Sequence, residues 1–215
     1  MVMPKPAARS YHHGNLRQAL LEAALELAQQ RGPEGVSVRE AARRLGVSPA
    51  APFRHFPNRR ALMTAMAEEA SERLRIEVRK SLTREKGNAL ERLSSVGRGY
   101  LQWARRHPSH FRIISARDQI DIAGSAALVR NVEEVRDLTV QALRAAQAQG
   151  LIAAELDAAA LALLARATVY GLARMQLDDH FGQWGIAPAA VPAAMNATLA
   201  LLVTLMAATA KLDRA

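Results

Sequence analysis

The chain of 215 residues contains no cysteine, and only 4% of its residues are aromatic. Without cysteine the protein has no disulfides and no thiolate chemistry, which is typical of a cytoplasmic protein, and we expect that location. The sequence also begins without a signal-peptide pattern, and we expect no apolar run long enough to cross a membrane.

The motifs that carry common catalytic chemistry are absent too. There is no glycine-rich phosphate loop and no G-x-S-x-G sequence. The carboxylate pairs 133–134 and 178–179 are adjacent in sequence, so their members do not share a helix face. The pairs His12-His13 and His107-x-x-His110 have no further ligand nearby. We therefore expect a protein that is not an enzyme and that uses no metal and no cofactor.

What the sequence does contain is an uneven excess of positive charge. The net charge is +9, and residues 1–60 hold ten Lys or Arg against four Asp or Glu, while the other 155 residues hold nineteen against sixteen. A basic patch attracts the phosphates of nucleic acids by releasing their counterions. A surface that only keeps the protein soluble is the alternative interpretation.

The apolar residues, half of the chain, recur at helical spacing and show no strand-like alternation and no internal repeat. The class is therefore all-α. Glycines, prolines and polar capping residues, among them Asn58, Ser125 and Asp157, divide the chain. We expect helices over residues 15–31, 37–46, 48–56, 59–82, 88–106, 109–116, 125–149, 157–180 and 192–211.

Residues 37–56, SVREAARRLGVSPAAPFRHF, have the spacing of a helix-turn-helix. Ser37 is a good N-cap, Glu40 completes a capping box, and Gly46 is suited to end the first helix. Ser48 followed by proline favours a second helix. Because Pro52 lacks an N–H, that helix either begins later or has a 3₁₀-like first turn. In a helix-turn-helix, the second helix lies in the DNA major groove.

The same region carries a family resemblance. The segments LLEAALELAQQRG, SVREAARRLGVS and FRHFPNRRAL, within Leu16–Leu62, resemble the DNA-binding domain of TetR-type transcriptional regulators. YHHGNL (Tyr11–Leu16) and VYGLA (Val169–Ala173) resemble one subgroup of that family. The sequence departs from many relatives at residues 50–52, which are Ala-Ala-Pro.

The resemblance implies a domain organisation and a function. Residues 1–14 would be a mobile arm, 15–60 a helix-turn-helix domain of three helices, and 61–215 a helical bundle for ligand binding and dimerisation. The protein would be a repressor that leaves a palindromic operator in double-stranded DNA when a small-molecule effector binds between helices 59–82 and 125–149.

The expected DNA contacts fall into three kinds. Positively charged or hydroxyl side chains at helix starts would position phosphates, and two polar side chains of the second helix would reach base edges, where Arg pairs with guanine. By resemblance, two alanines would touch thymine methyl groups. The phosphate-binding residues are Ser37, Arg39, Arg59 and Arg60; Ser48 and Phe53 serve the backbone or packing; Arg54 and His55 read bases; Ala50 and Ala51 are the alanines. Phe53, Phe56 and His55 have the alternative of local packing.

The stretches LALLARATVYGLA and ATLALLVTLMAATA are apolar or small nearly all round. Such helices need cover on more than one side, so we expect two helices from each of two protomers to form a four-helix interface. Burial wholly within one protomer is the alternative. A two-fold dimer would present its reading helices about 34–36 Å apart, one duplex turn.

Aromatic and methionine side chains are the candidates for the effector site, since Tyr and Trp combine an apolar body with one polar group. The candidates are Met66, Tyr100, Trp103, Phe111, Tyr170 and Met175. The alternative for each is that it fills a gap in the core. For the whole protein, the alternatives are a nucleoid-type DNA protein without sequence preference and a helical protein-interaction adaptor.

Overall fold

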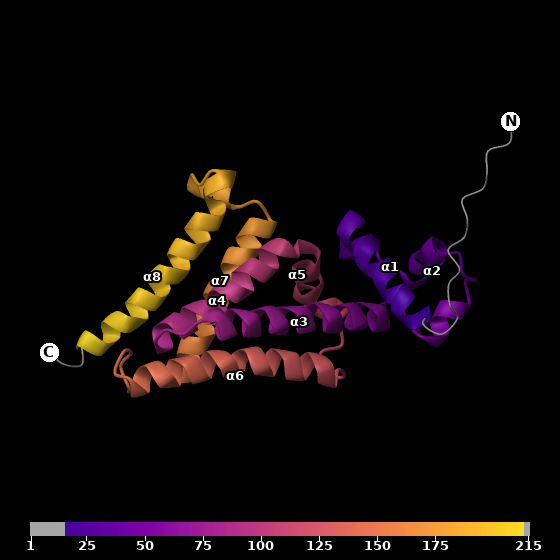
Figure 1. Ribbon diagram of the computed structural model, residues 1–215. Helices are drawn as coiled ribbons and strands as arrows, with labels where there is room; N and C mark the ends of the chain where they lie inside the picture. The colour runs from indigo at the N-terminus through magenta and orange to yellow at the C-terminus, as the bar shows by residue number, and fades with distance from the viewer. Residues whose placement is uncertain (1–15, 213–215) are drawn as a thin grey trace.

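The computed structural model describes residues 16–212. Over that range the chain forms α-helices and short 3₁₀ segments and no strand, which confirms the all-α class (Figure 1). The α-helices are α1 (Leu16–Arg31), α2 (Val38–Leu45), α3 (Arg59–Arg84), α4 (Ala89–Arg106), α5 (Pro108–Ser115), α6 (Ala126–Ala148), α7 (Ala158–Leu177) and α8 (Val191–Leu212). The 3₁₀ segments are η2 (Pro33–Gly35), η3 (Ala51–Arg54), η4 (Arg117–Gln119), η5 (Phe181–Trp184) and η6 (Pro188–Ala190).

The helix starts follow from the capping side chains. Asn58 Oδ1 accepts from the N–H of Ala61 at 2.8 Å, Ser125 Oγ accepts from that of Leu128 at 3.1 Å, and Asp157 Oδ1 accepts from that of Ala159 at 2.9 Å. Each bond satisfies a donor of the first turn that has no partner within the helix. The predicted starts of α3, α6 and α7 are confirmed.

The predicted capping box of α2 forms only in half. Ser37 Oγ accepts from the N–H of Glu40 at 3.1 Å. The Glu40 carboxylate, however, accepts from Arg43 Nε at 3.0 Å and from Arg31 at 3.1 Å. The Glu40 carboxylate thus bonds to one guanidinium group on its own helix, α2, and to another at the end of α1. At the other end of α2, Gly46 has the expected left-handed conformation, with φ of 69°.

The second helix of the helix-turn-helix differs from the expected span of residues 48–56. It is the four-residue 3₁₀ segment η3, and Ser48 makes no cap for it. The N–H groups of Phe53 and His55 donate to carbonyls three residues earlier, at 3.3 and 3.0 Å. Pro52 has no N–H to donate, so it interrupts the series of bonds that an α-helix would need. The 3₁₀ character expected for the first turn therefore extends over the whole segment.

Helix α3 runs through the molecule and joins its two ends (Figure 1). Its first half packs with α1 and α2 in a core that contains Met63 and Met66, and this core also takes in Ile113 of α5 and Ile120. Its second half packs with α4, α7 and α8 in another core. Gly99 of α4 permits the close approach of α3 and α4, because a Cβ there would lie 3.1 Å from the Val78 Cα. The predicted domain boundary at residue 60 thus falls at the first turn of a shared helix.

The last two helices lie on the outside of the bundle. By length and composition alone, Ala158–Leu177 and Pro188–Ala210 are long and apolar enough to cross a membrane, although the sequence pattern predicted no such run. Only 22% of each apolar window is buried in the single chain. Between them, α7 ends at Leu177, short of the predicted His180, and η5 buries Phe181.

Candidate nucleic-acid interface and effector cavity

The exposed side of α2 and η3 carries most of the predicted DNA contacts. Its side chains are held in place by a buried underside to which Val38, Pro52 and Phe56 contribute. The residues on the outer side are Arg39, Ser48, Ala50, Phe53, Arg54 and His55, all exposed, with Ser37 and Ala51 half-buried at its edge. Phe56 lies in the core at 2% exposure, as its alternative interpretation held, whereas Phe53 is 38% exposed.

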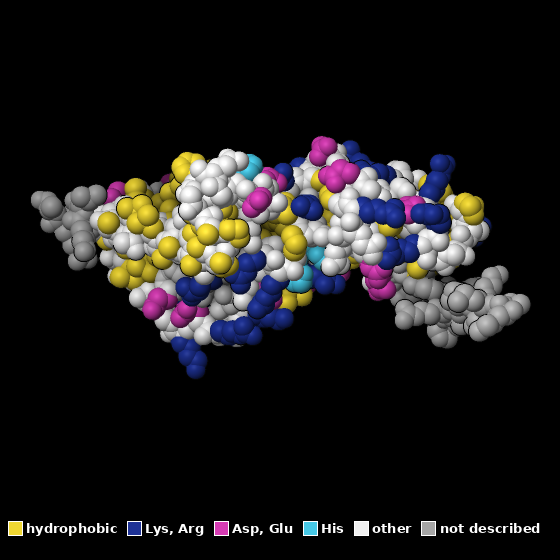
Figure 2. Space-filling view, turned by 90° about the horizontal axis from the view of Figure 1, so that it is seen from above, with side chains coloured by type: hydrophobic (Ala, Val, Ile, Leu, Met, Phe, Trp, Pro, Cys, Tyr) yellow, Lys and Arg dark blue, Asp and Glu magenta, His cyan; other side chains and the backbone are white. Residues whose placement is uncertain are grey.

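Some of the arginines on this side form ion pairs and others do not. Arg43 and Arg44 form ion pairs with Glu40 and Glu26. Arg39 and Arg54, by contrast, pair with no acidic side chain among residues 16–210. In Figure 2, Lys and Arg side chains spread over the end of the molecule that carries α1 and α2. Free guanidinium groups on an exposed turn are available for phosphates and base edges.

Arg59 occupies a different position from the other predicted contacts. It is half-buried, and its Nε donates to the Val36 carbonyl at 2.8 Å and its NH2 group to the Pro33 carbonyl at 2.7 Å. Its NH1 group donates to Gln119 Oε1 at 2.8 Å. The contacts give Arg59 a structural role that links the turn before α2 to the segment after α5. Its phosphate contact stays a prediction.

The segment after α5 is tied to α3 by further bonds. Arg60, which is exposed, donates to the Ile120 carbonyl at 3.3 Å. The N–H of Asp121 donates to Thr64 Oγ1 at 2.9 Å, and Ser125 Oγ bonds to Glu68 at 2.6 Å. Residues 117–125 therefore follow the first three turns of α3 closely.

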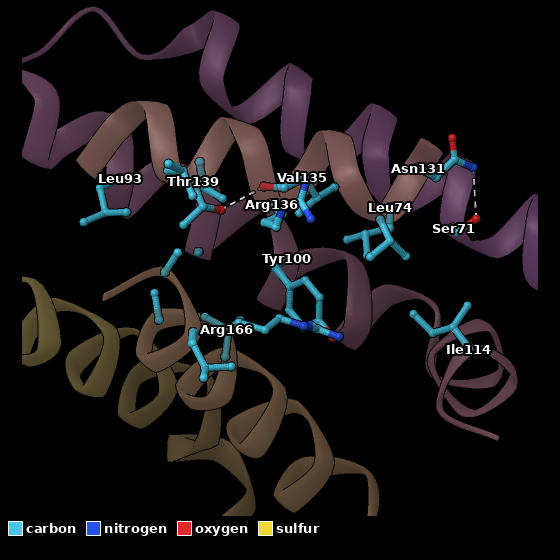
Figure 3. Close-up of a pocket in the computed structure, with 18 of the residues that line it drawn as sticks. Ser71, Leu74, Leu93, Tyr100, Ile114, Asn131, Val135, Arg136, Thr139 and Arg166 are labelled. Atoms are coloured by element: carbon cyan, nitrogen blue, oxygen red, sulfur yellow. Dashed lines mark hydrogen bonds between the residues drawn. The ribbon is translucent and has the colours of Figure 1, made fainter. Parts of the chain in front are cut away.

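A cavity of about 350 Å³ lies in the carboxy-terminal bundle, on the other side of this segment (Figure 3). Its walls come from α3, α4, α5, α6, α7 and α8, and Ile120 and Ile122 of the segment after α5 also line it. Most of the lining is aliphatic, including Leu74, Val96 and Val135. Cavities of this size and composition hold small molecules in many proteins.

Polar side chains reach this cavity from several helices, among them Ser71, Tyr100, Asn131 and Arg166. Tyr100 is 2% exposed, and its Oη has no hydrogen-bond partner among the described residues. Burial raises the pKa of the Tyr100 phenol. The Arg166 guanidinium lies 4.7 Å from the centre of that ring. At another wall the Asn131 amide donates to Ser71 Oγ at 3.0 Å, while its buried Oδ1 accepts no bond from the described part of the chain.

Among the six predicted effector residues, Tyr100 lines the cavity. Trp103 and Phe111 pack behind it, with ring centres 6.2 and 6.4 Å from that of Tyr100. Tyr170 packs on Phe111 at 5.5 Å. The two methionines lie in the cores: Met66 is buried beside the DNA-binding helices, and Met175 is half-buried in the carboxy-terminal bundle. Effector contact by these five residues stays a prediction.

Sequence reasoning did not name Arg166 or Asn131. Asn131 lies on an amphipathic helix, where an amide residue is most often solvated, and nothing local distinguishes it from its neighbours. Arg166 interrupts an otherwise apolar stretch, LALLARATVYGLA, and this was the one available signal.

The outer face of α7 and α8 exposes large apolar side chains. Leu163 is 70% exposed, Leu201 57% and Leu205 59%. Hydrophobic side chains gather near the carboxy-terminal end in Figure 2. We call the residues Leu163, Leu164, Leu201 and Leu205 the outer apolar face. Contiguous exposed patches of this kind mark interaction surfaces in soluble proteins.

The His107 and His110 rings are 5.4 Å apart. No group of three or more His, Cys, Asp or Glu among the described residues is arranged to hold a metal ion.

Two family patterns match the chain. Residues 93–202 match the tetracyclin repressor-like carboxy-terminal domain, and residues 20–66 match the bacterial regulatory proteins of the tetR family. The chain belongs to the TetR family. The resemblance seen in the amino-terminal motifs is thereby confirmed at the level of the family.

Known relatives of this TetR-family chain include the class C tetracycline repressor of Escherichia coli, 48% identical over 52 residues that make up 24% of each chain. The nucleoid occlusion factor SlmA of Vibrio campbellii is 30% identical over 124 residues, 57% of this chain and 58% of SlmA. The matched region thus spans a quarter to somewhat over half the length of these relatives.

Solved structures share the fold over nearly the whole length. A protein of unknown function from Rhodococcus sp. RHA1 has a TM-score of 0.76 and 31% identity, with 93% of this chain and 99% of that one covered. The TetR-family regulator PfmR of Thermus thermophilus has a TM-score of 0.67 and 19% identity, with 86% and 97% covered, and supports the fold alone.

Proposed function

We propose that this TetR-family protein is a dimeric, sequence-specific DNA-binding repressor that a small molecule releases from its operator. The observation that carries the proposal is the pair of free guanidinium groups, Arg39 and Arg54, on an exposed helix-turn-helix with a buried underside. We infer that Arg54 and His55 reach base edges and that Arg39 and Arg60 hold phosphates. The motifs YHHGNL and VYGLA support the subgroup assignment; residues 11–15 of the first lie outside the described residues, as does the predicted arm.

The outer apolar face supports dimerisation through α7 and α8. Burial of a leucine side chain contributes roughly 1.5–3 kcal/mol, so four leucines on each of two protomers are a sufficient driving force. A membrane would leave Arg166, in the middle of α7, in the hydrocarbon region at high cost. A second copy covers the leucines and leaves the charge at the cavity, so we infer a four-helix interface in a cytoplasmic dimer.

A two-fold dimer presents its two η3 segments to one duplex. We infer a palindromic operator whose half-sites are about 34–36 Å apart, one helical turn. Because η3 is only one short turn, we infer that it enters the groove with its last residue, Arg54, and with the next residue, His55.

The proposed release step depends on residues 117–125, the segment that lies between the cavity and the DNA-binding helices. Ile120 and Ile122 line the cavity, and the neighbouring Gln119 and Ile120 bond to Arg59 and Arg60 at the start of α3. An effector between α3 and α6 that favours one position of this segment would tilt α3 and change the η3 spacing. Only a difference in its affinity for the two states can produce that shift.

The experiment that tests this function is selection of bound duplexes from a random pool by the full chain. We expect an enriched palindrome, with an affinity for it that falls steeply as salt increases. No enrichment, or an affinity that salt does not change, would refute sequence-specific DNA binding.

The second candidate is a nucleoid-type DNA protein without sequence preference. The similarity to a nucleoid occlusion factor supports only the association with the nucleoid. That candidate predicts equal affinity for all duplexes in the same selection. A protein-interaction adaptor predicts that Arg39→Ala and Arg54→Ala leave DNA binding unchanged.

A further inference from the structure

The charged side chains that line the cavity are all of one sign. They are Arg117 of η4, Arg136 of α6 and Arg166 of α7, and no Asp or Glu from the described part of the chain lines it. Arg136 pairs with its neighbour Asp137 at 3.0 Å. Arg166 forms no salt bridge with any residue between 16 and 210. A cavity with this lining favours a ligand that brings negative charge of its own.

Arg166, whose side chain lines the cavity and is exposed in the single chain, is placed to hold an anionic group at the edge of the cavity. Its guanidinium carbon lies 4.7 Å from the ring centre of Tyr100 and 5.1 Å from that of Tyr170. Figure 3 shows the side chain extending beneath the Tyr100 ring. Stacking fixes the guanidinium plane while its N–H groups remain free to donate, and a carboxylate accepts two of them at once. The Oη of Tyr100 is buried and has no hydrogen-bond partner among the described residues, so a ligand group that reached it would satisfy it.

The rest of the lining determines the polarity and size of the remainder of the ligand. Leucine, valine and isoleucine side chains make up most of the wall, so the remainder of the ligand must be apolar. Taking about 30 Å³ for each water-sized group, the cavity of about 350 Å³ holds roughly a dozen non-hydrogen atoms.

From these observations we propose that the cavity binds an amphipathic carboxylate of about a dozen non-hydrogen atoms, with its head at Arg166 and Tyr100. The proposal names the class of effector and in that respect rests on the proposed function. The binding itself requires neither DNA nor an operator, so the two can be tested apart.

The test is calorimetric titration of the full chain, without DNA, with decanoate and with decanamide. The two probes have the same length and differ in charge. We expect decanoate to bind at least tenfold more tightly, since hydrogen bonds to a charged group are worth more than neutral ones. Arg166→Gln should remove that preference by weakening decanoate about tenfold and leaving decanamide unchanged.

Arg174→Gln is the matched control, because Arg174 lies on the same helix, pairs with Asp178 at 2.6 Å and does not line the cavity. It should keep the full preference. Tyr100→Phe, which deletes only the hydroxyl, should weaken the binding of decanoate severalfold. This second variant provides the test if Arg166→Gln fails to fold or dimerise. Equal binding of the two probes would overturn the proposal, as would a preference that persists in both variants. Failure of decanoate, octanoate and phenylbutanoate all to bind would also overturn it.

A second readout separates this proposal from the proposed function. If decanoate binds but does not displace the selected duplex, the proposed ligand class is supported and its role as effector is refuted. If only uncharged molecules release the selected duplex, the repressor function is supported and the carboxylate proposal is refuted.

Discussion

At the scale of single residues, Arg54 gives the most direct prediction. Its side chain is exposed and has no acidic partner among the described residues, so Arg54→Ala should leave the unfolding free energy within about 0.5 kcal/mol of wild type. Loss of a base contact costs about 1–3 kcal/mol, so affinity for the selected duplex should fall roughly tenfold or more, and the preference at one base pair should relax. Fluorescence anisotropy with selected and random duplexes measures both effects.

The control for Arg54 is Arg84→Ala, which removes an equal charge from the far end of α3. An equal loss of affinity in the two variants would mean that Arg54 acts only through the net charge.

The lowered pKa of His110 should make the unfolding free energy depend on pH. Burial lowers its pKa to about 4, the charges of Arg73 and His107 act in the same direction, and Glu69 opposes them. The unfolded chain has a histidine pKa near 6.5, so below that pH the unfolded state binds more protons and stability falls as pH falls. Stability is fully retained above pH 6.5.

With allowance for partial solvent screening of His110, the loss between pH 6.5 and 5.0 should be about 1 kcal/mol, or about 2–4 °C in Tm. The lowered pKa values of Glu40, Glu72, Glu85 and Glu134 affect stability only at lower pH. His110→Gln should reduce the slope in this window and leave the part that belongs to His107, whose pKa burial also lowers. His180→Gln, at an exposed site, should not change it. A slope unchanged by His110→Gln would contradict the assignment.

At the scale of the elements, Arg59 is the link between the turn before α2 and the segment after α5. Its three bonds, at 2.7–2.8 Å, satisfy two backbone carbonyls and Gln119. Arg59→Ala leaves these acceptors without their donor, so we expect the unfolding free energy to fall by about 2 kcal/mol in urea titrations. Gln119→Ala, which removes only one of the bonds, should cost less. Equal stability of Arg59→Ala and wild type would show that the link is unimportant.

The elements also show how far the sequence could predict the fold. Capping residues such as Asn58, Ser125 and Asp157 act within one turn, and the helix starts they predict are confirmed. The capping box at Ser37 formed only in half because Arg43, on the same helix, and Arg31, on another helix, both bond to Glu40. The contact with Arg43 is local, whereas the one with Arg31 is not. The latter depends on tertiary contacts, which the local sequence does not contain.

The cavity was less predictable than the helices. Its lining comes from six helices far apart in the sequence, and its aliphatic residues are of the same types as those of the packed core. The aromatic residues drew attention because they are few, yet Trp103 and Phe111 pack behind Tyr100. Arg166 stacks on Tyr170, four residues later on the same helix, and on Tyr100 of α4, which only the fold brings to it.

At the scale of the whole molecule, the proposed dimer depends on the outer apolar face. Leu201 and Leu205 are 57% and 59% exposed, on one side of α8. The double variant Leu201→Asp/Leu205→Asp places four charges in the proposed four-helix interface, and burial of unpaired charge is strongly unfavourable. Sedimentation velocity at micromolar concentration should show a folded monomer in place of the dimer. Glu155→Lys, at an exposed site before α7, is the control and should stay dimeric.

The measurement that tests the account most directly is the number of chains bound to one selected duplex, determined by sedimentation velocity. The account predicts two wild-type chains on each palindrome. It also predicts that Leu201→Asp/Leu205→Asp loses tight binding while its helical circular dichroism is unchanged. One wild-type chain per duplex, or a monomeric variant that binds the palindrome as tightly as wild type, would contradict it.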